Sequence, residues 1–126
     1  MAMNSQIVLS AYRRVGIVAA DEPMTAEQQN SGLDELRAMV RSWETWGIKA
    51  GPGDFNPDEA FPLPEMFEDG SATILAGRLA EMHGLPGPDG REALNRMIAL
   101  TYQMDEAEVP LTLRRTDPVR RLWSGY

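Results

Sequence analysis

The sequence predicts an all-α protein. We expect a four-helix bundle-like domain over residues 1–106 that carries a long Pro/Gly loop, followed by an extended C-terminal docking arm over residues 107–126. Four segments repeat apolar residues at spacings of three and four, which places those residues on one face of a helix. A capping residue, a glycine or a proline bounds each of these segments. Only Val109, Leu111 and Leu113 alternate as a strand would, and no second strand-like segment is present to pair with them.

The first two predicted helices span residues 5–18 and 25–46. Asn4 or Ser5 caps the first helix. Thr25 and Gln28 form a capping box for the second, in which each side chain binds a free amide of the first turn. Gly47 suits the left-handed residue that ends a helix. The apolar face of the first helix comprises Ile7, Val8, Ala11, Tyr12 and Val15, and that of the second comprises Leu33, Leu36, Met39 or Val40, Trp43 and Trp46.

Residues 47–63 form the long loop, because three prolines and three glycines interrupt any helix or central strand there. Phe55 and Phe61 are expected to fix this loop to the helices. The third helix spans residues 64–83, with Ser71 as an alternative start because Gly70 weakens a helix interior, and the fourth spans 90–106 with Asp89 and Glu92 as its capping pair. The apolar residues assigned to these helices are Met66, Phe67, Ile74, Leu75, Leu79 and Met82, then Leu94, Met97, Ile98, Thr101 and Tyr102.

The composition restricts the kinds of catalytic and metal-binding sites that the chain can form. The chain has no cysteine and one histidine, His83, so we expect no thiol catalysis, no Cys-ligated metal and no Ser-His-Asp triad, and we assign no cofactor and no metal. No apolar run reaches about 18 residues, so we expect no membrane span. Residues 1–106 hold 8 basic and 17 acidic residues, a balance of −9, and such a body repels nucleic acid.

The arm differs from the body because residues 107–126 hold four arginines against two acidic residues. Arg, Trp and Tyr dominate the energetics of protein interfaces, so a protein partner is favoured over phosphate binding. We assign a docking role to the basic and aromatic residues of the arm, which are Arg114, Arg115, Arg120, Arg121, Leu122, Trp123 and Tyr126.

Carboxylates are the only abundant groups with catalytic potential. Glu65, Glu68 and Asp69 cluster in the sequence, as do Asp105, Glu106 and Glu108. A small carboxylate-dependent hydrolase would need two of them across a cleft in different environments. Runs of charge are usually helix ends exposed to solvent. We prefer this interpretation of the two clusters over a catalytic site. A cytoplasmic helical protein-interaction module is a further alternative, and it predicts a closed symmetric dimer.

Two tryptophans close the second predicted helix. Trp43 is predicted to be a core anchor, together with Leu36, Met39 and Leu79. Trp46 lies one turn further on, where contact with another subunit competes with core packing.

Three segments resemble the podovirus-type head-to-tail adaptors of bacteriophages, also called packaged-DNA stabilisation proteins or tail accessory factors. The pattern Leu36-x-x-Met39-Val40-x-x-Trp43-x-x-x-Gly47-Ile48 resembles the end of the family's long helix. Residues 6–17 resemble its opening helix, and Pro62-Leu63-Pro64 followed by Ile74-Leu75-Ala76-x-x-Leu79-Ala80 resembles its next helix. The resemblance covers residues 6–105. Trp46 lies within this range but is not a position of the family's pattern, and residues 114–126 match no motif of the family.

The resemblance implies a structural protein rather than an enzyme. Such adaptors form a ring, usually of twelve subunits, beneath the portal of a filled phage head. The ring extends the DNA channel, retains the packaged genome and receives a tail or nozzle protein, while DNA passes without specific binding. The expected location is the neck of the virion, and the host cytoplasm during assembly. In the family the C-terminal helix and tail grip the portal, and this region corresponds to residues 90–126 here.

Overall fold

A computed structural model describes residues 2–51 and 53–108. It contains the helices α1 (Asn4–Arg14), α2 (Ala26–Ser42), α3 (Glu68–Met82) and α4 (Arg91–Glu108), with short 3-10 turns at Trp43–Trp46 (η1) and Glu65–Phe67 (η2). The predicted all-α class is confirmed. Within the described ranges the only β-type pairing is an isolated bridge between Met3 and Ala60.

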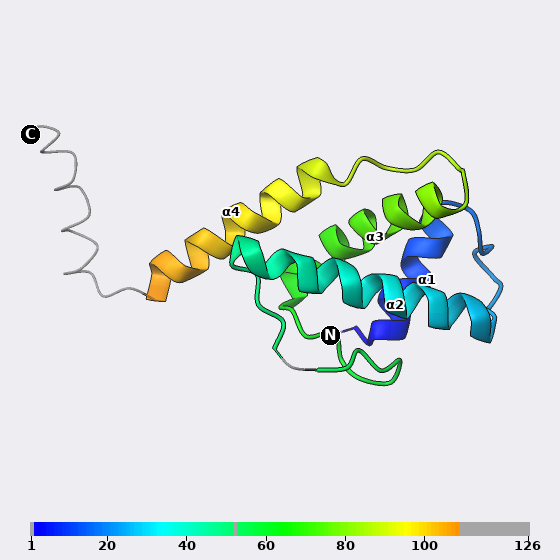
Figure 1. Cartoon of the computed structure of the whole chain (residues 1–126), viewed down its shortest axis with the longest axis horizontal. Helices are drawn as coiled ribbons and strands as arrows, with labels where there is room; N and C mark the ends of the chain where they lie inside the picture. The colour runs from blue at the N-terminus through cyan, green and yellow to red at the C-terminus, as the bar shows by residue number, and fades with distance from the viewer. Residues whose placement is uncertain (1, 52, 109–126) are drawn as a thin grey trace, which may run out of the picture.

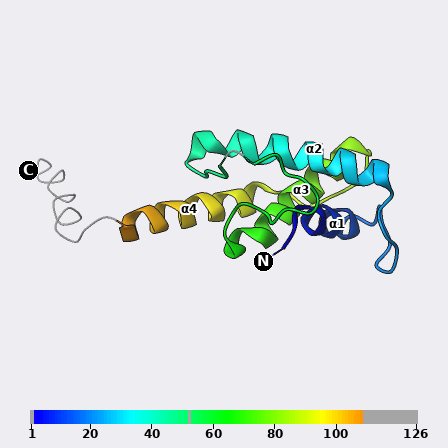
Figure 2. The same cartoon turned by 90° about the horizontal axis from the view of Figure 1, so that it is seen from below.

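Helix α3 lies at the centre of the bundle. It packs against α1, α2 and α4, while α1 also packs against α2 (Figures 1 and 2). Arg78 of α3 donates a hydrogen bond to Glu35 of α2 at 2.6 Å. The most deeply buried large side chains come from α1, α2, α3 and the long loop, and they include Val8, Tyr12, Leu36, Met39, Val40, Ile48, Phe61, Leu75 and Leu79. Among the described helices, none combines the length and hydropathy needed to cross a bilayer.

Helix α1 is shorter than predicted. It ends at Arg14 because Gly16 follows with a φ of 78°, a left-handed conformation that stops the helix. The predicted cap is also wrong: Met3 is the N-cap residue, and Gln6 accepts a hydrogen bond from its N–H at 2.8 Å. Asn4 is instead the first helical residue. Its buried amide donates to the carbonyl of Asn56 at 3.0 Å, which ties the start of α1 to the long loop.

Helix α2 begins as predicted, because Thr25 Oγ1 accepts from the Gln28 N–H at 3.1 Å and Gln28 Oε1 accepts from the Thr25 N–H at 3.0 Å. The α-helix stops at Ser42 and tightens into η1, which Gly47 ends with a φ of 86°. Gly32 allows α1 to approach closely, since a Cβ at that position would lie 2.2 Å from Val8 Cγ1. Nearby, Tyr12 donates to the carbonyl of Gln28 at 2.9 Å, and burial raises the pKa of its hydroxyl.

The long loop is present as predicted, and both of its phenylalanines are buried. Two arginines of α2 hold it through its backbone. Arg37 donates to the carbonyl of Asp54 at 2.8 Å, and Arg41 donates to the carbonyl of Gly53 at 2.6 Å. The Arg41 guanidinium also lies 5.5 Å from the centre of the Phe55 ring, a cation–π distance. These contacts hold the described residues of the loop against α2.

Helix α3 begins at Glu68 after η2, so the alternative start at Ser71 is wrong. Gly70 stays inside the helix because Met97 of α4 lies against it, with Sδ 2.9 Å from the position of an added Cβ. Gly84 ends the helix with a φ of 68°, and the Leu85 N–H donates to the Ala80 carbonyl at 2.8 Å. The prediction that Met66 and Met82 belong to the apolar face is wrong: Met66 lies in η2 before the helix, Met82 is its last residue, and both are exposed.

Helix α4 starts where Asp89 Oδ1 accepts from the Arg91 N–H at 3.0 Å. Glu92 does not complete the predicted capping pair in the described contacts, since it forms an ion pair with Arg96. Met97 and Thr101 are buried and Leu94 and Ile98 are half-buried, whereas Tyr102 points outward, contrary to prediction. The helix runs to Glu108, two residues past its predicted end.

Candidate functional site: the base of helix α4

The two tryptophans of η1 have opposite environments. Trp43 is 3% exposed and belongs to the core, whereas Trp46 is 52% exposed. The 3-10 turn changes the angular spacing of the side chains from that of the α-helix, so Trp46 falls outside the predicted apolar face although Trp43 and Ile48 on either side of it are buried. The other residues predicted as core anchors, Leu36, Met39 and Leu79, are fully buried.

The end of η1 lies beside the middle of α4. A Cβ at Gly47 would lie 3.8 Å from Thr101 Cγ2, and Thr101 is itself buried and donates to the Met97 carbonyl at 2.9 Å. The next residue of α4, Tyr102, is 65% exposed. Trp46 and Tyr102 therefore stand at the same end of the bundle, at the point where α4 leaves it. We call these two residues the aromatic base of α4.

Beyond the aromatic base, α4 extends past the ends of the other helices in both views (Figures 1 and 2). Gln103 is exposed like Tyr102. The predicted docking residues Arg114, Arg115, Arg120, Arg121, Leu122, Trp123 and Tyr126 follow this extension in the sequence and lie outside the described residues. Of the residues assigned to an interface from the sequence, only Trp46 is placed by the structure.

A groove of about 250 Å³ runs between α3 and α4. Its apolar lining comes from Met66, Ala93, Met97 and Leu100, and its charged lining from Asp69, Asp89, Glu92 and Arg96. Ligand pockets usually measure roughly 300–1,000 Å³. The groove is thus small for an enclosed substrate site, and we call it the α3/α4 groove.

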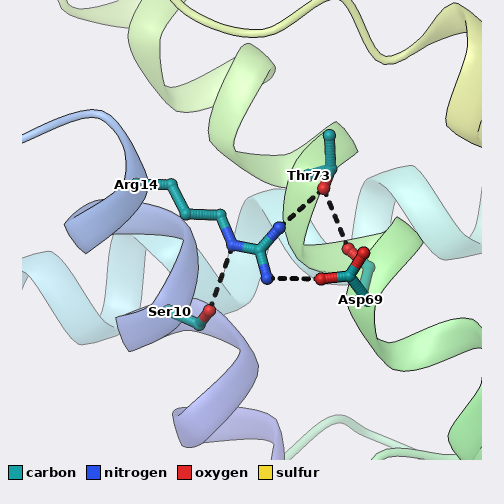
Figure 3. Close-up of polar contacts among 4 residues, drawn as sticks. All are labelled: Ser10, Arg14, Asp69 and Thr73. Atoms are coloured by element: carbon teal, nitrogen blue, oxygen red, sulfur yellow. Dashed lines mark hydrogen bonds and ion pairs between the residues drawn. The ribbon is translucent and has the colours of Figure 1, made fainter.

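One carboxylate beside the groove belongs to a polar cluster that joins α1 to α3 (Figure 3). Arg14 donates to Asp69 at 2.8 Å, to the Thr73 hydroxyl at 2.7 Å and to the Ser10 hydroxyl at 3.3 Å. Thr73 in turn donates to the Asp69 carbonyl at 3.0 Å. The Asp69 side chain is 86% exposed, so this ion pair is open to solvent.

The other carboxylates considered for a hydrolase are placed differently. Glu68 accepts a hydrogen bond from the Ala2 N–H at 3.0 Å, and Glu65 is exposed on η2. The side chain of Glu106 lies outside the described part of the chain. Asp69 and Glu68 are therefore engaged with α1 and the N-terminal segment, and these contacts do not form the facing pair that glycoside hydrolysis requires.

The single histidine lies at a helix end. His83 is exposed at the C-terminal end of α3, where it caps the helix. Within the described residues, no group of three or more His, Cys, Asp or Glu side chains is arranged to hold a metal ion.

Comparisons with known proteins were negative: no protein-family model, no curated protein and no solved structure matches this chain.

Sequence reasoning missed two features of the molecular surface, the outward position of Tyr102 and the α3/α4 groove. The spacing of Leu94, Met97, Ile98, Thr101 and Tyr102 is fully helical, so periodicity alone assigned Tyr102 to the buried face. The end of the bundle beside Thr101 is set by the contact with Gly47, and a one-dimensional pattern does not contain that contact.

Proposed function

We propose that the protein is a structural head-to-tail adaptor of a tailed bacteriophage. The observation that carries this proposal is the extension of α4 beyond the bundle from a base of exposed aromatic residues, followed by an arginine-rich segment. Helices in proteins gain most of their stability from packing. A projecting helix with an aromatic base is therefore a natural surface for a second protein, because aromatic residues and arginine dominate interface energetics.

The charge of the chain supports a place around a DNA channel. A balance of −9 over residues 1–106 disfavours tight phosphate binding, which suits a lumen through which DNA must slide. In this proposal about twelve copies join head to tail, since heterologous interfaces of this kind close into rings. The ring binds the portal protein on one side and a tail or nozzle protein on the other, in the neck of the virion, after assembly in the host cytoplasm.

The decisive experiment combines this chain with the portal protein encoded in the same genome. Electron microscopy of the mixture should show an additional ring beneath the portal. A chain lacking residues 109–126 should keep the helical circular dichroism of the full chain and no longer join the portal. Portal binding by the truncated chain would contradict the docking role of the arm.

A single substitution tests the aromatic base in the same mixture. Trp46→Ala should leave the monomer folded, because the side chain is half exposed, and should reduce the number of complete rings. If the full chain ignores the portal and forms a two-fold dimer through the same surface, the alternative of a helical interaction module is the better one. Sedimentation of the isolated chain distinguishes a dimer from a monomer awaiting a template.

A further inference from the structure

We propose that the α3/α4 groove is a docking site for the chain's own C-terminal arm, residues 109–126, which folds back along α4 in the free protein. This inference goes beyond the proposed function and does not depend on it. It rests on the chemistry of the groove, on the opposite chemistry of the arm, and on the length of chain that follows Glu108.

The groove offers an apolar floor with an acidic rim. Met66 is 56% exposed at one end of it, and Met97, Ala93 and Leu100 line the rest. Three carboxylates, from Asp69, Asp89 and Glu92, line the rim with one cation, Arg96, and Arg14 of α1 pairs with Asp69 from outside the groove. The ion pairs that Asp69 and Glu92 form are exposed to solvent, where such pairs are weak. These carboxylates can therefore accept further hydrogen bonds from arginines.

The arm supplies the complementary groups. Its four arginines occur as two pairs, at 114–115 and 120–121, and the second pair is followed directly by Leu122 and Trp123. Guanidinium groups bind carboxylates through strong charge-assisted hydrogen bonds, and flexible methionine side chains adapt to aromatic and apolar partners. The charges of the arm and the groove are thus complementary, and docking requires that the arm can reach the groove.

The reach is sufficient. Along α4, at a rise of about 1.5 Å per residue, Leu100 lies roughly 12 Å and Glu92 roughly 24 Å before Glu108. An extended chain spans about 3.3 Å per residue, so Arg114 reaches roughly 20 Å and Arg121 roughly 43 Å from the same point. The first arginine pair thus reaches the Leu100 end of the groove, and the second pair reaches as far as Glu92. A short tether gives an effective concentration of the order of millimolar, so in dilute solution the chain's own arm outcompetes that of a second copy.

A pair of engineered cysteines tests this arrangement, because the full chain contains none. Ala93→Cys places a thiol in the groove, and Thr116→Cys places one between the arginine pairs. In micromolar protein under mild oxidation, this pair should form an intramolecular disulfide roughly ten-fold faster than the pair Ala38→Cys and Thr116→Cys, because the tether acts on both pairs and docking adds to the local concentration only at the groove. Ala38 is an exposed position of α2 and serves as the control. Leu100→Cys is a second reporter if Ala93→Cys alters the melting temperature.

Charge variants of the chain that carries the two cysteines test whether the acidic rim of the groove causes the faster disulfide formation. Asp69→Asn combined with Glu92→Gln should slow the disulfide several-fold, and so should raised salt, which screens exposed charges. The matched control is Asp34→Asn with Glu44→Gln, two exposed carboxylates that also pair with arginines but lie on α2 and η1. That control should leave the rate unchanged.

Three results would overturn the proposal. Equal rates for the groove and control pairs would mean that the arm does not prefer the groove. Predominantly intermolecular disulfides would assign the groove to the arm of a second copy. Insensitivity to the Asp69 and Glu92 changes would remove the electrostatic basis. Portal binding is measured on the chain without cysteines, so its failure concerns the proposed function alone.

Discussion

Helices α3 and α4 are neighbours of similar length, but their packing differs. Helix α3 has 15 residues and buries Ser71, Ala72, Leu75, Ala76, Leu79 and Ala80. Helix α4 has 18 residues, and among its described side chains only Met97 and Thr101 are buried. Helix α3 is thus enclosed by the rest of the chain on several sides. Helix α4 is held along one side of its first three turns. The part of the molecule that we propose as a docking surface is thus the part that its own core stabilises least.

The same comparison explains the small residues at the contact between the two helices. Gly70 admits Met97, and Gly77 of α3 admits the chain just before α4, with the Pro88 carbonyl oxygen 2.6 Å from the position of an added Cβ. Gly87 and Gly90 approach Ala80 and Ile74 in the same way. These contacts hold the linker and the start of α4 tightly against α3. After Thr101, no close glycine contact of this kind is found in the described part of α4.

The largest effect on stability is expected from a substitution in the core. Trp43→Ala removes a buried aromatic side chain and should lower the free energy of unfolding by about 3–5 kcal/mol. The matched variant Trp46→Ala changes the same residue type one turn later, at an exposed site, and should stay within about 0.5 kcal/mol. Urea denaturation of both variants measures the difference. Similar losses for the two would mean that the base of α4 is part of the core.

A smaller loss of stability is expected from a substitution at the contact between α4 and α3. Met97→Ala empties the contact with Gly70 and should cost about 2 kcal/mol, the lower end of the range for such truncations because the site is at the edge of the core. Amide hydrogen exchange should accelerate over residues 91–108 and change little in α1 and α2, since weakly packed elements open locally. Equal acceleration in all four helices would show that α4 is as integral to the bundle as α3.

Substitutions at two glycines of α3 test the tight contact between α3 and the chain just before α4. Gly77→Ala forces a methyl group against a backbone carbonyl, which cannot move alone, so we expect a net loss of about 1–2 kcal/mol despite the better helix propensity of alanine. Gly70→Ala faces only the flexible end of Met97, so the propensity gain should offset the clash. Thermal melts of the two variants give the comparison. A more stable Gly77→Ala chain would mean that the linker is free to shift.

The sequence predicted the parts of this fold that depend on local pattern. The capping box of Thr25 and Gln28, the stop at Gly47 and the burial of Leu36, Met39 and Trp43 follow from residue type and spacing. The errors arise where tertiary contacts decide. Gly70 belongs to a helix because Met97 fills the space beside it, and Asn4 enters α1 because the distant carbonyl of Asn56 accepts its amide. For the candidate site, the sequence left Trp46 open between core packing and contact with another subunit, and the exposure of Tyr102 depends on where the bundle ends.

The smallest effect is expected from the polar cluster that joins α1 to α3 (Figure 3). Arg14→Met keeps the apolar stem and removes the donors to Asp69, Thr73 and Ser10, so we expect a loss of about 0.5–1 kcal/mol, the scale of exposed ion pairs. The loss should shrink at high salt because the Asp69 carboxylate is open to solvent. In the Arg14→Met background, Asp69→Asn should then have no further effect, and a double-mutant cycle by urea denaturation measures this coupling. A loss of several kcal/mol, independent of salt, would instead mean that this cluster holds α1 on α3 as firmly as the buried side chains do.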